Sequence, residues 1–286
     1  MEMVAHTQLI KDESYTLNIC FDLFNKRIRV DDLTGNLAKV IKKAEKLAKT
    51  QNVEKLIIKA RYEHFSYLMN NGFQCEAVID RYFLGSDLYF FCKYYTNERR
   101  ISNEWLKEEQ IVENVVYLEQ SRQMTIPPAH YHLKKLTVED ADKLANLYEQ
   151  VFQIYPTPLN DPDYIVKTMA EGTIYYGFYS DEEIVSAASA EINSFYKNAE
   201  LTDCATLQEH RKHGLMKILL EELEKELRSS AIYCAYSIAR SLSFGMNAAL
   251  HQLGYQYRGR LTNNCYIFDN LEDMNVWVKD LSHDSL

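Results

Sequence analysis

The stretch AELTDCATLQEHRKHGLMKILLEELEKEL, residues 199–227, decides the fold of this chain. It begins as a strand, breaks at a short polar turn and continues as an amphipathic helix, because leucines recur at three- and four-residue steps from Leu215 to Leu227 while charged residues take the other face. The turn, residues 211–216, places three basic-type side chains and Gly214 at the start of this helix. Free backbone amides and the helix dipole favour an anion there, and a glycine lets the anion approach the main chain. The stretch therefore predicts a site for an anion such as a pyrophosphate, although a plain helix start with solvated charges would have the same residues.

The composition indicates a folded protein with room for two domains. The chain has 286 residues, of which 47% are hydrophobic and 26% are charged. No apolar run approaches the roughly 20 residues of a membrane helix, and residues 1–10 lack the basic start and apolar middle of a signal peptide. We therefore expect a cytoplasmic protein without a membrane partner.

Charge and cysteine usage narrow the range of partners. The net charge of −9 argues against nucleic acid, whose binding needs a basic surface, and agrees better with a cationic substrate. The cysteines stand singly in apolar segments, without the paired spacing of a metal site, at positions Cys20, Cys75, Cys92, Cys204, Cys234 and Cys265. We expect free thiols and no bound metal.

The second part of the chain has a recognisable order of elements. Residues 130–270 indicate a strand, two helices, three antiparallel strands, the glycine-start helix, a strand, a helix and two final strands at 256–260 and 264–269. Thr137 and Asp140 have the spacing of a capping box at the first helix, and Asn263–Asn264 either contacts the substrate or forms a hairpin turn. This order resembles the fold of the GNAT N-acetyltransferases. The resemblance implies an α/β (α+β) fold with a mixed, mostly antiparallel sheet flanked by helices.

The turn before the helix also resembles a motif of that family, the Arg/Gln-x-x-Gly-x-Gly/Ala loop. Arg211 and Gly214 match this loop, whereas Met216 stands where the family usually has glycine or alanine. The resemblance implies that acetyl-CoA is the cosubstrate and that successive backbone amides hold its pyrophosphate. The residues that it assigns to acetyl-CoA binding are Thr206, Leu207, Arg211, Lys212, His213, Gly214, Leu215, Met216 and Lys217.

The order strand, helix, strand, helix, strand, strand also occurs earlier, in residues 1–125. We interpret residues 1–125 as a degenerate GNAT-like domain and residues 130–286 as the catalytic domain, with the boundary near Pro127–Pro128. The first domain carries Asp31 and Asp32 where a phosphate loop would lie, and their charges would repel a pyrophosphate. We therefore expect this domain to serve packing or dimerisation, and in the second case the protein would be a homodimer.

The end of the second domain carries a more specific resemblance. The segments SFGMN (243–247), GYQYRGRLTNNC (254–265) and EDMNVW (272–277), together with the two-domain layout, resemble the beta-lysine N-acetyltransferases of bacteria and archaea. This resemblance implies acetylation of the ε-amino group of beta-lysine, a small-molecule amine, to give a compatible solute used against osmotic stress. Two alternatives stay open: acetylation of another amine, such as lysine, a polyamine or an aminoglycoside, and a non-catalytic acyl-CoA sensor.

The chemistry of acetyl transfer requires a proton acceptor. An amine attacks a thioester only when neutral, so a carboxylate must take the proton of the ammonium form, whose pKa is about 10. The acids on the strands near the thioester are Asp203, Glu200 and Glu191. Asp203 and Glu200 are three residues apart and point to opposite faces in an unbroken strand. We expect Asp203 to be the catalytic base, although a salt-bridged strand acid would look the same, and we assign Glu191 to catalysis and to substrate binding as the second candidate.

The remaining roles are assigned more loosely. The resemblance places the catalytic oxyanion donor at a backbone amide near Thr206 or Leu207. Many family members have a tyrosine as the leaving-group acid where this chain has Leu250, so the acid is not assigned. An amino-acid substrate needs a guanidinium for its carboxylate, for which we expect Arg240, and Asn247 is expected to bind a polar end of the substrate. The alternative for Arg240, favoured on general grounds, is an ordinary surface charge.

Overall fold

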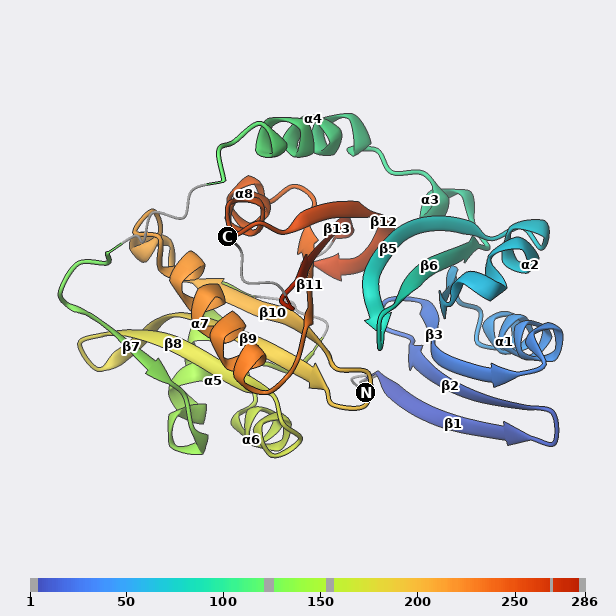
Figure 1. Cartoon of the computed structure of the whole chain (residues 1–286), viewed down its shortest axis with the longest axis horizontal. Coiled ribbons are helices and arrows are strands. Elements are labelled where there is room, and N and C mark those ends of the chain that lie inside the picture. The colour runs from blue at the N-terminus through green and yellow to red at the C-terminus, as the bar shows by residue number, and fades with distance from the viewer. Residues whose placement is uncertain (1–4, 121–125, 153–156, 268–269, 283–286) are drawn as a thin grey trace.

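A computed structural model describes residues 5–120, 126–152, 157–267 and 270–282 of the chain (Figure 1). We call residues 5–95 the N-terminal half, residues 96–120 the connector and residues 126–282 the C-terminal half. The N-terminal half contains β1 (His6–Asp12), β2 (Tyr15–Asp22), β3 (Arg27–Gly35), α1 (Leu37–Thr50), β4 (Lys55–Ala60), η1 (Tyr62–His64), α2 (Phe65–Asn70), β5 (Gln74–Phe83) and β6 (Ser86–Tyr94). The connector contains α3 (Asn97–Arg100) and α4 (Trp105–Val116). The C-terminal half contains β7 (Tyr131–Lys135), η2 (Val138–Asp140), α5 (Ala141–Val151), α6 (Pro162–Ala170), β8 (Ile174–Ser180), β9 (Glu183–Asn193), β10 (Asn198–Thr206), η3 (Gln208–His210), α7 (Leu215–Ser229), β11 (Cys234–Arg240), α8 (Phe244–Gln252), β12 (Gln256–Ile267) and β13 (Asn270–Asp280).

All the described strands belong to one 13-stranded sheet. Its order is β1-β2-β3-β4-β6-β5-β12-β13-β11-β10-β9-β8-β7, so the two halves meet edge to edge through β5 and β12. The pairs β3–β4 and β10–β11 are parallel, and the other pairs are antiparallel. In Figure 1, α1 and α2 lie on the outer side of the N-terminal half and α4 crosses the top of the molecule. The expected mixed, mostly antiparallel sheet flanked by helices is confirmed.

Two sequence signals explain how the helices of the C-terminal half form. The leucine stripe of α7 is buried as expected and consists of Leu215, Leu219, Leu220, Leu223 and Leu227. Before α5, Thr137 and Asp140 form the expected capping box, in which the Thr137 amide donates to Asp140 Oδ2 at 2.8 Å. These contacts satisfy the helix start and bury its apolar face.

In each half, one face of the sheet is covered by a helix, α1 or α7. The two other faces, turned away from these helices, pack against each other. Their shared core includes Ile57, Ala77, Ile79, Leu88 and Phe90 from the N-terminal half and Tyr236, Leu261, Met274, Val276 and Val278 from the C-terminal half. Side chains that point away from α1 therefore reach the same interior as side chains that point away from α7.

Buried polar contacts hold the two halves together along β12. The ammonium of Lys55, which is fully buried, lies 2.9 Å from Glu76 Oε2 and donates to the Thr262 carbonyl at 2.7 Å. Arg99 of the connector, also fully buried, donates to the Asn264 carbonyl at 3.0 Å. Backbone carbonyls of one half are thus satisfied by charged side chains from the other half and the connector.

The end of the chain forms strands that differ from those expected. Of the two final strands expected at 256–260 and 264–269, the first and the described residues 264–267 of the second are parts of one strand, β12, which pairs with β13. The alternative of a hairpin turn at Asn263 is wrong, because Asn263 lies within β12 and its side-chain amide donates to the carbonyls of Glu98, Arg99 and Ile101. The register of β12 shifts around these residues, which a local sequence pattern cannot indicate.

The start of α1 also differs from the expectation. Asp31 and Asp32 do not occupy the connection before the helix, because both lie within β3. The connection is Asn36 alone, whose side chain accepts from the Lys39 amide. Charge repulsion by the two aspartates is therefore not what distinguishes this helix start from that of α7.

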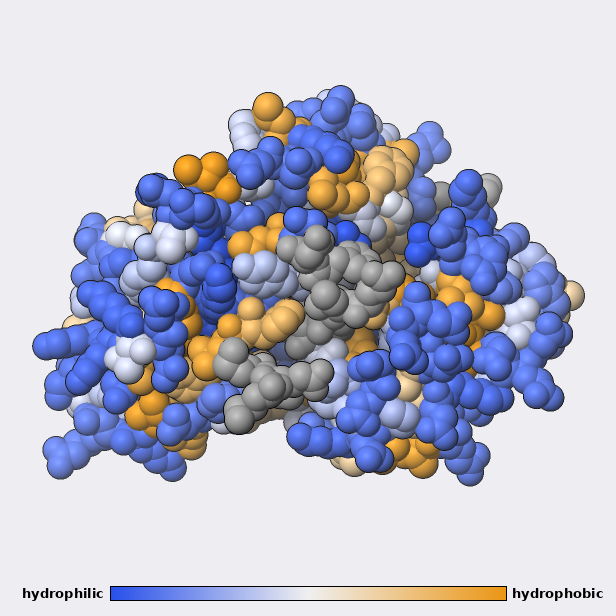
Figure 2. All heavy atoms as spheres, turned by 180° about the vertical axis from the view of Figure 1, so that it is seen from behind, coloured by the Kyte–Doolittle hydropathy of each residue, from blue (hydrophilic) through white to orange (hydrophobic). Residues whose placement is uncertain are grey.

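The state of the cysteines agrees with the expectation of free thiols. All six cysteines are free. Within the described ranges, no group of three or more His, Cys, Asp or Glu side chains is arranged to hold a metal ion. None of the helices in this part of the chain combines the length and the apolar character that a membrane crossing requires. Figure 2 shows that hydrophilic residues cover most of the face seen from behind.

Candidate active site

β10 and β11 separate within the C-terminal half. Among the described residues, parallel pairing joins only Asn198–Glu200 to Cys234–Tyr236, after which β10 continues to Thr206 and β11 to Arg240. A cavity of about 1430 Å³ lies here and is lined by both strands, by the start of α7 and by residues of the N-terminal half. The separation of the strands thus gives a ligand access to the middle of the sheet.

The start of α7 opens into this cavity. Gly214 is the N-cap residue with a φ of 72°, a conformation that glycine adopts without strain. No side chain of the described residues caps this helix start, and its first turn holds no acidic residue. The free amides and the positive end of the helix dipole therefore suit an anion in the cavity. This geometry fits the pyrophosphate loop expected at residues 211–216.

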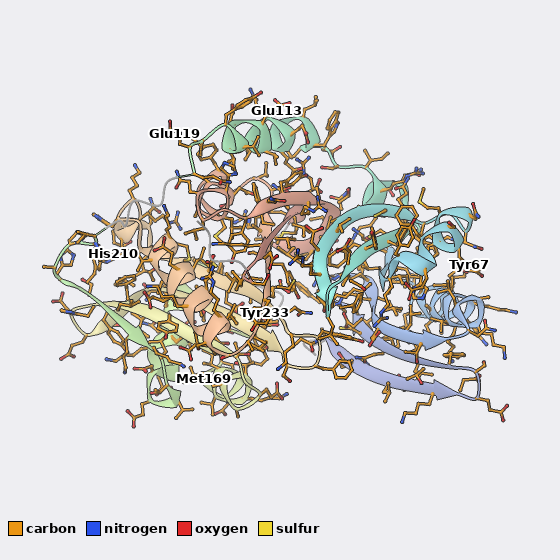
Figure 3. All side chains as sticks on the ribbon, in the orientation of Figure 1. Tyr67, Glu113, Glu119, Met169, His210 and Tyr233 are labelled. Atoms are coloured by element: carbon orange, nitrogen blue, oxygen red, sulfur yellow. The ribbon has the colours of Figure 1, made fainter. Side chains whose placement is uncertain are left out.

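Most of the residues expected to bind acetyl-CoA lie together at this end of the cavity. Those that line it are Thr206, Arg211, Lys212, Gly214, Leu215, Met216 and Lys217. The ring of His213 instead packs on Tyr131, with ring centroids 5.5 Å apart. His210, labelled in Figure 3, was not expected but lines the cavity, and its Nδ1 lies 2.9 Å from Tyr131 Oη. The turn is therefore held by aromatic contacts to β7.

Backbone geometry favours Thr206 over Leu207 as a donor to an oxyanion. The Leu207 amide donates to the Val185 carbonyl at 3.0 Å, so the expectation that it is available in the site is wrong. Hydrogen-bonded and non-hydrogen-bonded pairs alternate in an antiparallel ladder, so Thr206, opposite Ser186, turns its amide away from β9. Its carbonyl accepts from Arg211 Nε at 3.2 Å, on the side of the cavity. The Thr206 amide stays a prediction for the oxyanion donor.

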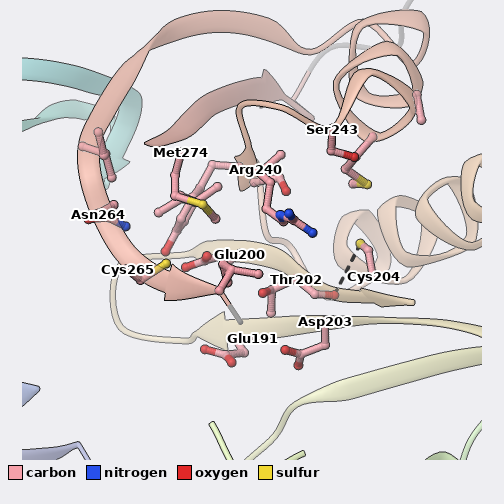
Figure 4. Close-up of a pocket in the computed structure, with 18 of the residues that line it drawn as sticks. Glu191, Glu200, Thr202, Asp203, Cys204, Arg240, Ser243, Asn264, Cys265 and Met274 are labelled. Carbon is pink, nitrogen blue, oxygen red and sulfur yellow. Dashed lines mark hydrogen bonds between the residues drawn. The ribbon is translucent and has the colours of Figure 1, made fainter. Parts of the chain in front are cut away.

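A β-bulge in β10 brings Asp203 and Glu200 to the same face. The register with β9 shifts between Thr202 and Ala205, and Asp203 has a φ of 50°. Glu200 lies directly opposite Glu191, and the three acids all line the cavity. Figure 4 shows the carboxylates of Glu191 and Asp203 side by side. The expectation that Asp203 and Glu200 point to opposite faces is wrong, because the extra residue of the bulge cancels the alternation of an unbroken strand.

We call Glu191, Glu200 and Asp203 the acidic wall; its members differ in environment. Asp203 is buried and accepts a hydrogen bond from Ser189 Oγ at 2.7 Å. Glu191 opens into the cavity, where desolvation by the surrounding protein and the charges of Glu200 and Asp203 raise its pKa to about 8. Desolvation also raises the pKa of Glu200. A carboxyl group with a pKa near 8 is well placed to accept a proton near neutral pH.

Arg240 and Asn247, the residues expected to bind the acceptor, lie in different surroundings. Arg240 lines the cavity, and its Nε and Nη2 each donate to Glu272 at 2.6 Å. Figure 4 shows its guanidinium pointing from β11 toward β10. Asn247 is fully buried, accepts from Trp277 Nε1 at 2.8 Å and donates to the carbonyls of Arg240 and Ser243. The expected contact between Asn247 and the substrate is therefore wrong: this amide is not among the cavity residues and fixes the start of α8.

The N-terminal half supplies cavity residues that were not expected from the sequence. Arg29 of β3, Lys59 of β4 and Tyr82 of β5 line the same cavity as the acidic wall. The sequence does carry a signal at Arg29, which stands between the apolar residues Ile28 and Val30. In the structure both neighbours are fully buried. A charged residue at the alternate positions of such a strand needs a charged partner or a solvated cavity.

An uncapped glycine helix start beside two separating parallel strands, within a sheet of this order, defines a protein of the GNAT acetyltransferase class. The model of the Acetyltransferase (GNAT) family matches residues 142–255. The chain is 40% identical over 272 residues to the N-acetyltransferase YodP of Bacillus subtilis (strain 168), which covers 95% of this chain and 98% of that protein. The chain therefore belongs to the GNAT family and is an N-acetyltransferase.

Two further relatives have a more specific name, beta-lysine N(6)-acetyltransferase. The one from Methanococcus maripaludis is 35% identical over 255 residues, covering 89% of this chain and 93% of its own. The one from Methanosarcina mazei is 33% identical over 270 residues, covering 87% of this chain and 100% of its own. The expected resemblance to this group is confirmed, and it extends over both halves of the chain.

Proposed function

We propose that the protein transfers the acetyl group of acetyl-CoA to the ε-amino group of beta-lysine. The observation that carries this proposal is one cavity that contains both the open start of α7 and the acidic wall. An anion site and a group of carboxylates in one cavity suit an anionic donor and a cationic acceptor. The names of two relatives that span both halves support beta-lysine as the acceptor.

The residues at the start of α7 are suited to hold the pyrophosphate of acetyl-CoA, which supplies the thioester. The amides that follow Gly214 are oriented by the helix, and Lys212 and Lys217 add positive charge at the cavity. Met216 packs in part against the core beneath α7, which supports a loop that accommodates a residue larger than the usual glycine or alanine.

The acidic wall is suited to bind the acceptor and to take its proton. Glu191, with a pKa of about 8, is our first choice for the proton acceptor, because its ionised form is more basic than an ordinary carboxylate. Asp203, the base expected from the sequence, stays the alternative and otherwise positions the ammonium group. Once neutral, the nitrogen attacks the thioester carbonyl and the Thr206 amide donates to the oxyanion. The carbon–sulfur bond then breaks to release the thiolate, and the nitrogen gives its second proton to water.

The product has the charge of a compatible solute. Beta-lysine carries two ammonium groups and one carboxylate, and acetylation of one amine leaves a zwitterion without net charge. A neutral solute accumulates without counterions, so we propose that the enzyme acts in the cytoplasm in protection against osmotic stress.

Thiol release with a panel of amines tests the proposed acceptor. Beta-lysine, lysine and spermidine are compared at equal concentrations with saturating acetyl-CoA, and NMR locates the acetyl group on the product. We expect the highest kcat/KM with beta-lysine and acetylation at its ε-nitrogen. A higher kcat/KM with lysine or spermidine would rule out beta-lysine as the preferred acceptor, while the protein would still be an N-acetyltransferase.

A further inference from the structure

Two basic residues of the N-terminal half share the cavity with the acidic wall. Arg29 on β3 and Lys59 on β4 lie on neighbouring parallel strands and line the cavity. Both point away from α1, because their sequence neighbours, such as Val30 and Ile58, pack in the core beneath α1. Arg29 and Lys59 therefore reach the interior that the two halves share, opposite the acidic wall of the C-terminal half.

The charges of this basic pair are only partly balanced. Asp31 accepts from Arg29 Nε at 2.5 Å and from Nη2 at 3.2 Å, and lies 3.0 Å from the Lys59 ammonium. Although burial opposes it, the charges of Arg29 and Lys59 hold the pKa of Asp31 well below its ordinary value, so this carboxylate is ionised. Two cations beside one carboxylate leave an excess of one positive charge. Within the described part of the chain, neither cation forms an ion pair with the acidic wall, although the charges of both act on Glu200 through the cavity.

The guanidinium of Arg29 can still accept a ligand. Asp31 occupies Nε and one Nη2 hydrogen, while Nη1 forms no hydrogen bond to any described residue. The Arg29 side chain retains 33% of its accessible surface, and Tyr82 lies beneath the Lys59 ammonium at 5.7 Å from its ring centroid. A planar guanidinium edge beside an ammonium is the donor set that recognises a carboxylate.

We propose that Arg29 and Lys59 bind the carboxylate of the acceptor, so that the N-terminal half forms one wall of the acceptor site. This proposal rests on the proposed function and adds the residues that recognise the acid end of the substrate. With the carboxylate on this basic pair, the ammonium groups of the acceptor face the acidic wall. Arg240, expected from the sequence to bind the carboxylate, is less suited because its single charge is matched one to one by Glu272, whereas Arg29 and Lys59 share one carboxylate.

A purely structural role for the basic pair makes a different prediction. If Arg29 and Lys59 only balanced the acidic wall, their loss would affect every acceptor amine to the same extent. If they bind the acceptor carboxylate, their loss affects only acceptors that carry this group. An acceptor without the carboxylate therefore separates the two roles.

Kinetics with beta-lysine and its carboxamide, in which a neutral amide replaces the carboxylate, test the proposal. Wild-type enzyme is expected to prefer beta-lysine over the carboxamide. Arg29→Met and Lys59→Met are each expected to lower kcat/KM for beta-lysine by about 10-fold, mainly through KM, because one charge-assisted contact is lost. At the high-pH plateau, where Glu191 is ionised with or without the nearby positive charges, the same variants should leave kcat/KM for the carboxamide and the affinity for acetyl-CoA nearly unchanged.

Lys93→Met is the matched control. Lys93 is also a partly buried lysine of the N-terminal half and pairs with Glu45 at 2.6 Å, but it is not among the cavity residues. Its loss should leave kcat/KM unchanged for both beta-lysine and the carboxamide. Equal losses of kcat/KM with beta-lysine and with the carboxamide would overturn the proposal. A wild-type enzyme with the same kcat/KM for both acceptors would also overturn it, and this measurement does not depend on the folding of a variant. A wild-type enzyme that acetylates neither beta-lysine nor any other amine would reject the proposed function itself.

Discussion

The two halves of the sheet have the same layout and different helix starts. Counted outward from the joint, the strand orders are β5-β6-β4-β3-β2-β1 and β12-β13-β11-β10-β9-β8. Each half has one parallel pair connected by a helix, β3–α1–β4 and β10–α7–β11. We propose that the N-terminal half is a degenerate copy of the catalytic half, and its role in dimerisation stays a prediction.

The connections before the two helices explain why only one half suits an anion. α1 follows β3 after Asn36 alone, whose side chain accepts from the Lys39 amide at 3.1 Å and whose amide donates to the Ser14 carbonyl at 2.9 Å. α7 follows β10 after residues 207–214 and starts at Gly214 without a side-chain cap. The strand–helix–strand unit alone therefore does not make an anion site. The connection must also leave the helix amides free.

Matching strand positions in the two halves carry opposite charges. Arg29 and Glu200 are each the third residue of their parallel register, and both point away from the helix of their own half. Because these two sheet faces pack together, one half adds a basic wall and the other an acidic wall to the same cavity. The comparison supports our proposal that the N-terminal half contributes to the acceptor site rather than forming a second active site.

Lys55→Met is expected to have the largest effect, because the joint between the halves contains this buried charge. Without Lys55, the Glu76 carboxylate, whose side chain is 7% exposed, loses its ionic partner and the Thr262 carbonyl loses a donor. The free energy of unfolding should fall by about 3–5 kcal/mol. Chemical denaturation measures this change.

Cys234→Ala is the control at the matching position of the C-terminal half. Lys55 and Cys234 are each the first residue of β4 and β11 to enter the parallel register. The loss of one small buried side chain should lower the free energy of unfolding by only about 1 kcal/mol. Similar losses for the two variants would show that the joint does not depend on the Lys55–Glu76 pair.

Glu191→Gln tests the acidic pair that only the C-terminal half has. Glu191 faces Glu200 across β9 and β10, whereas the residue that faces Arg29 across β2 and β3 is Cys20. The kcat/KM of the variant at pH 8 should fall by about 100-fold, because a general base is lost. In the wild type, Glu191 is protonated below its pKa of about 8 and cannot accept a proton, so kcat/KM should rise with pH and level off above 8.

The pH profile of Asp203→Asn decides between the two candidate bases. If Glu191 is the proton acceptor, Glu191→Gln removes the rise of kcat/KM with pH below pH 8. Asp203→Asn then retains this rise, with lower values of kcat/KM. A Glu191→Gln enzyme that still shows the wild-type rise would transfer the role to another group at the cavity, with Asp203 and Glu200 as the nearest acids. Stopped-flow assays of thiol release over pH 6–10 measure these profiles.

Gly214→Asp should make the start of α7 resemble that of α1. The new carboxylate would take up free amides of the helix and repel the pyrophosphate of acetyl-CoA. We expect the affinity for acetyl-CoA to fall by about 30-fold, or about 2 kcal/mol, as measured by calorimetric titration. Gly214→Asn has the same size and the same backbone strain at the φ of 72°, so it should weaken binding less. Equal affinities of these two variants would argue against charge repulsion at this helix start.

Local sequence patterns predicted much of the C-terminal half. The leucines of α7, the capping box at Thr137 and the loop at Arg211–Gly214 all act over a few residues, so the pattern alone is sufficient. The direction of Asp203 could not be predicted in this way. It depends on a bulge opposite Ala188, which is set by the pairing of two strands.

Local sequence patterns could not predict the contacts between the two halves. The sequence indicates the strands β3 and β10, but they face each other only because β5 and β12 join the two halves. The residues paired at this joint, Ala77 and Gly259, are far apart in the chain. Gly259 has a φ of 126°, and a Cβ there would lie 2.3 Å from the Glu76 carbonyl oxygen. The apolar neighbours of Arg29 can be recognised in the sequence, but only the fold shows that Arg29 lines the candidate active-site cavity.

Asn36→Ala should have the smallest effect and should change stability alone. The side chain of Asn36 caps α1, and the loss of an N-cap costs about 1 kcal/mol of the free energy of unfolding. Because the turn at Ser14 still covers this helix start, the variant should bind the same single equivalent of acetyl-CoA as the wild type. Denaturation and calorimetric titration of one preparation measure both quantities. A second bound equivalent would show that the Asn36 cap alone, rather than the short connection between β3 and α1, keeps the anion from the N-terminal half.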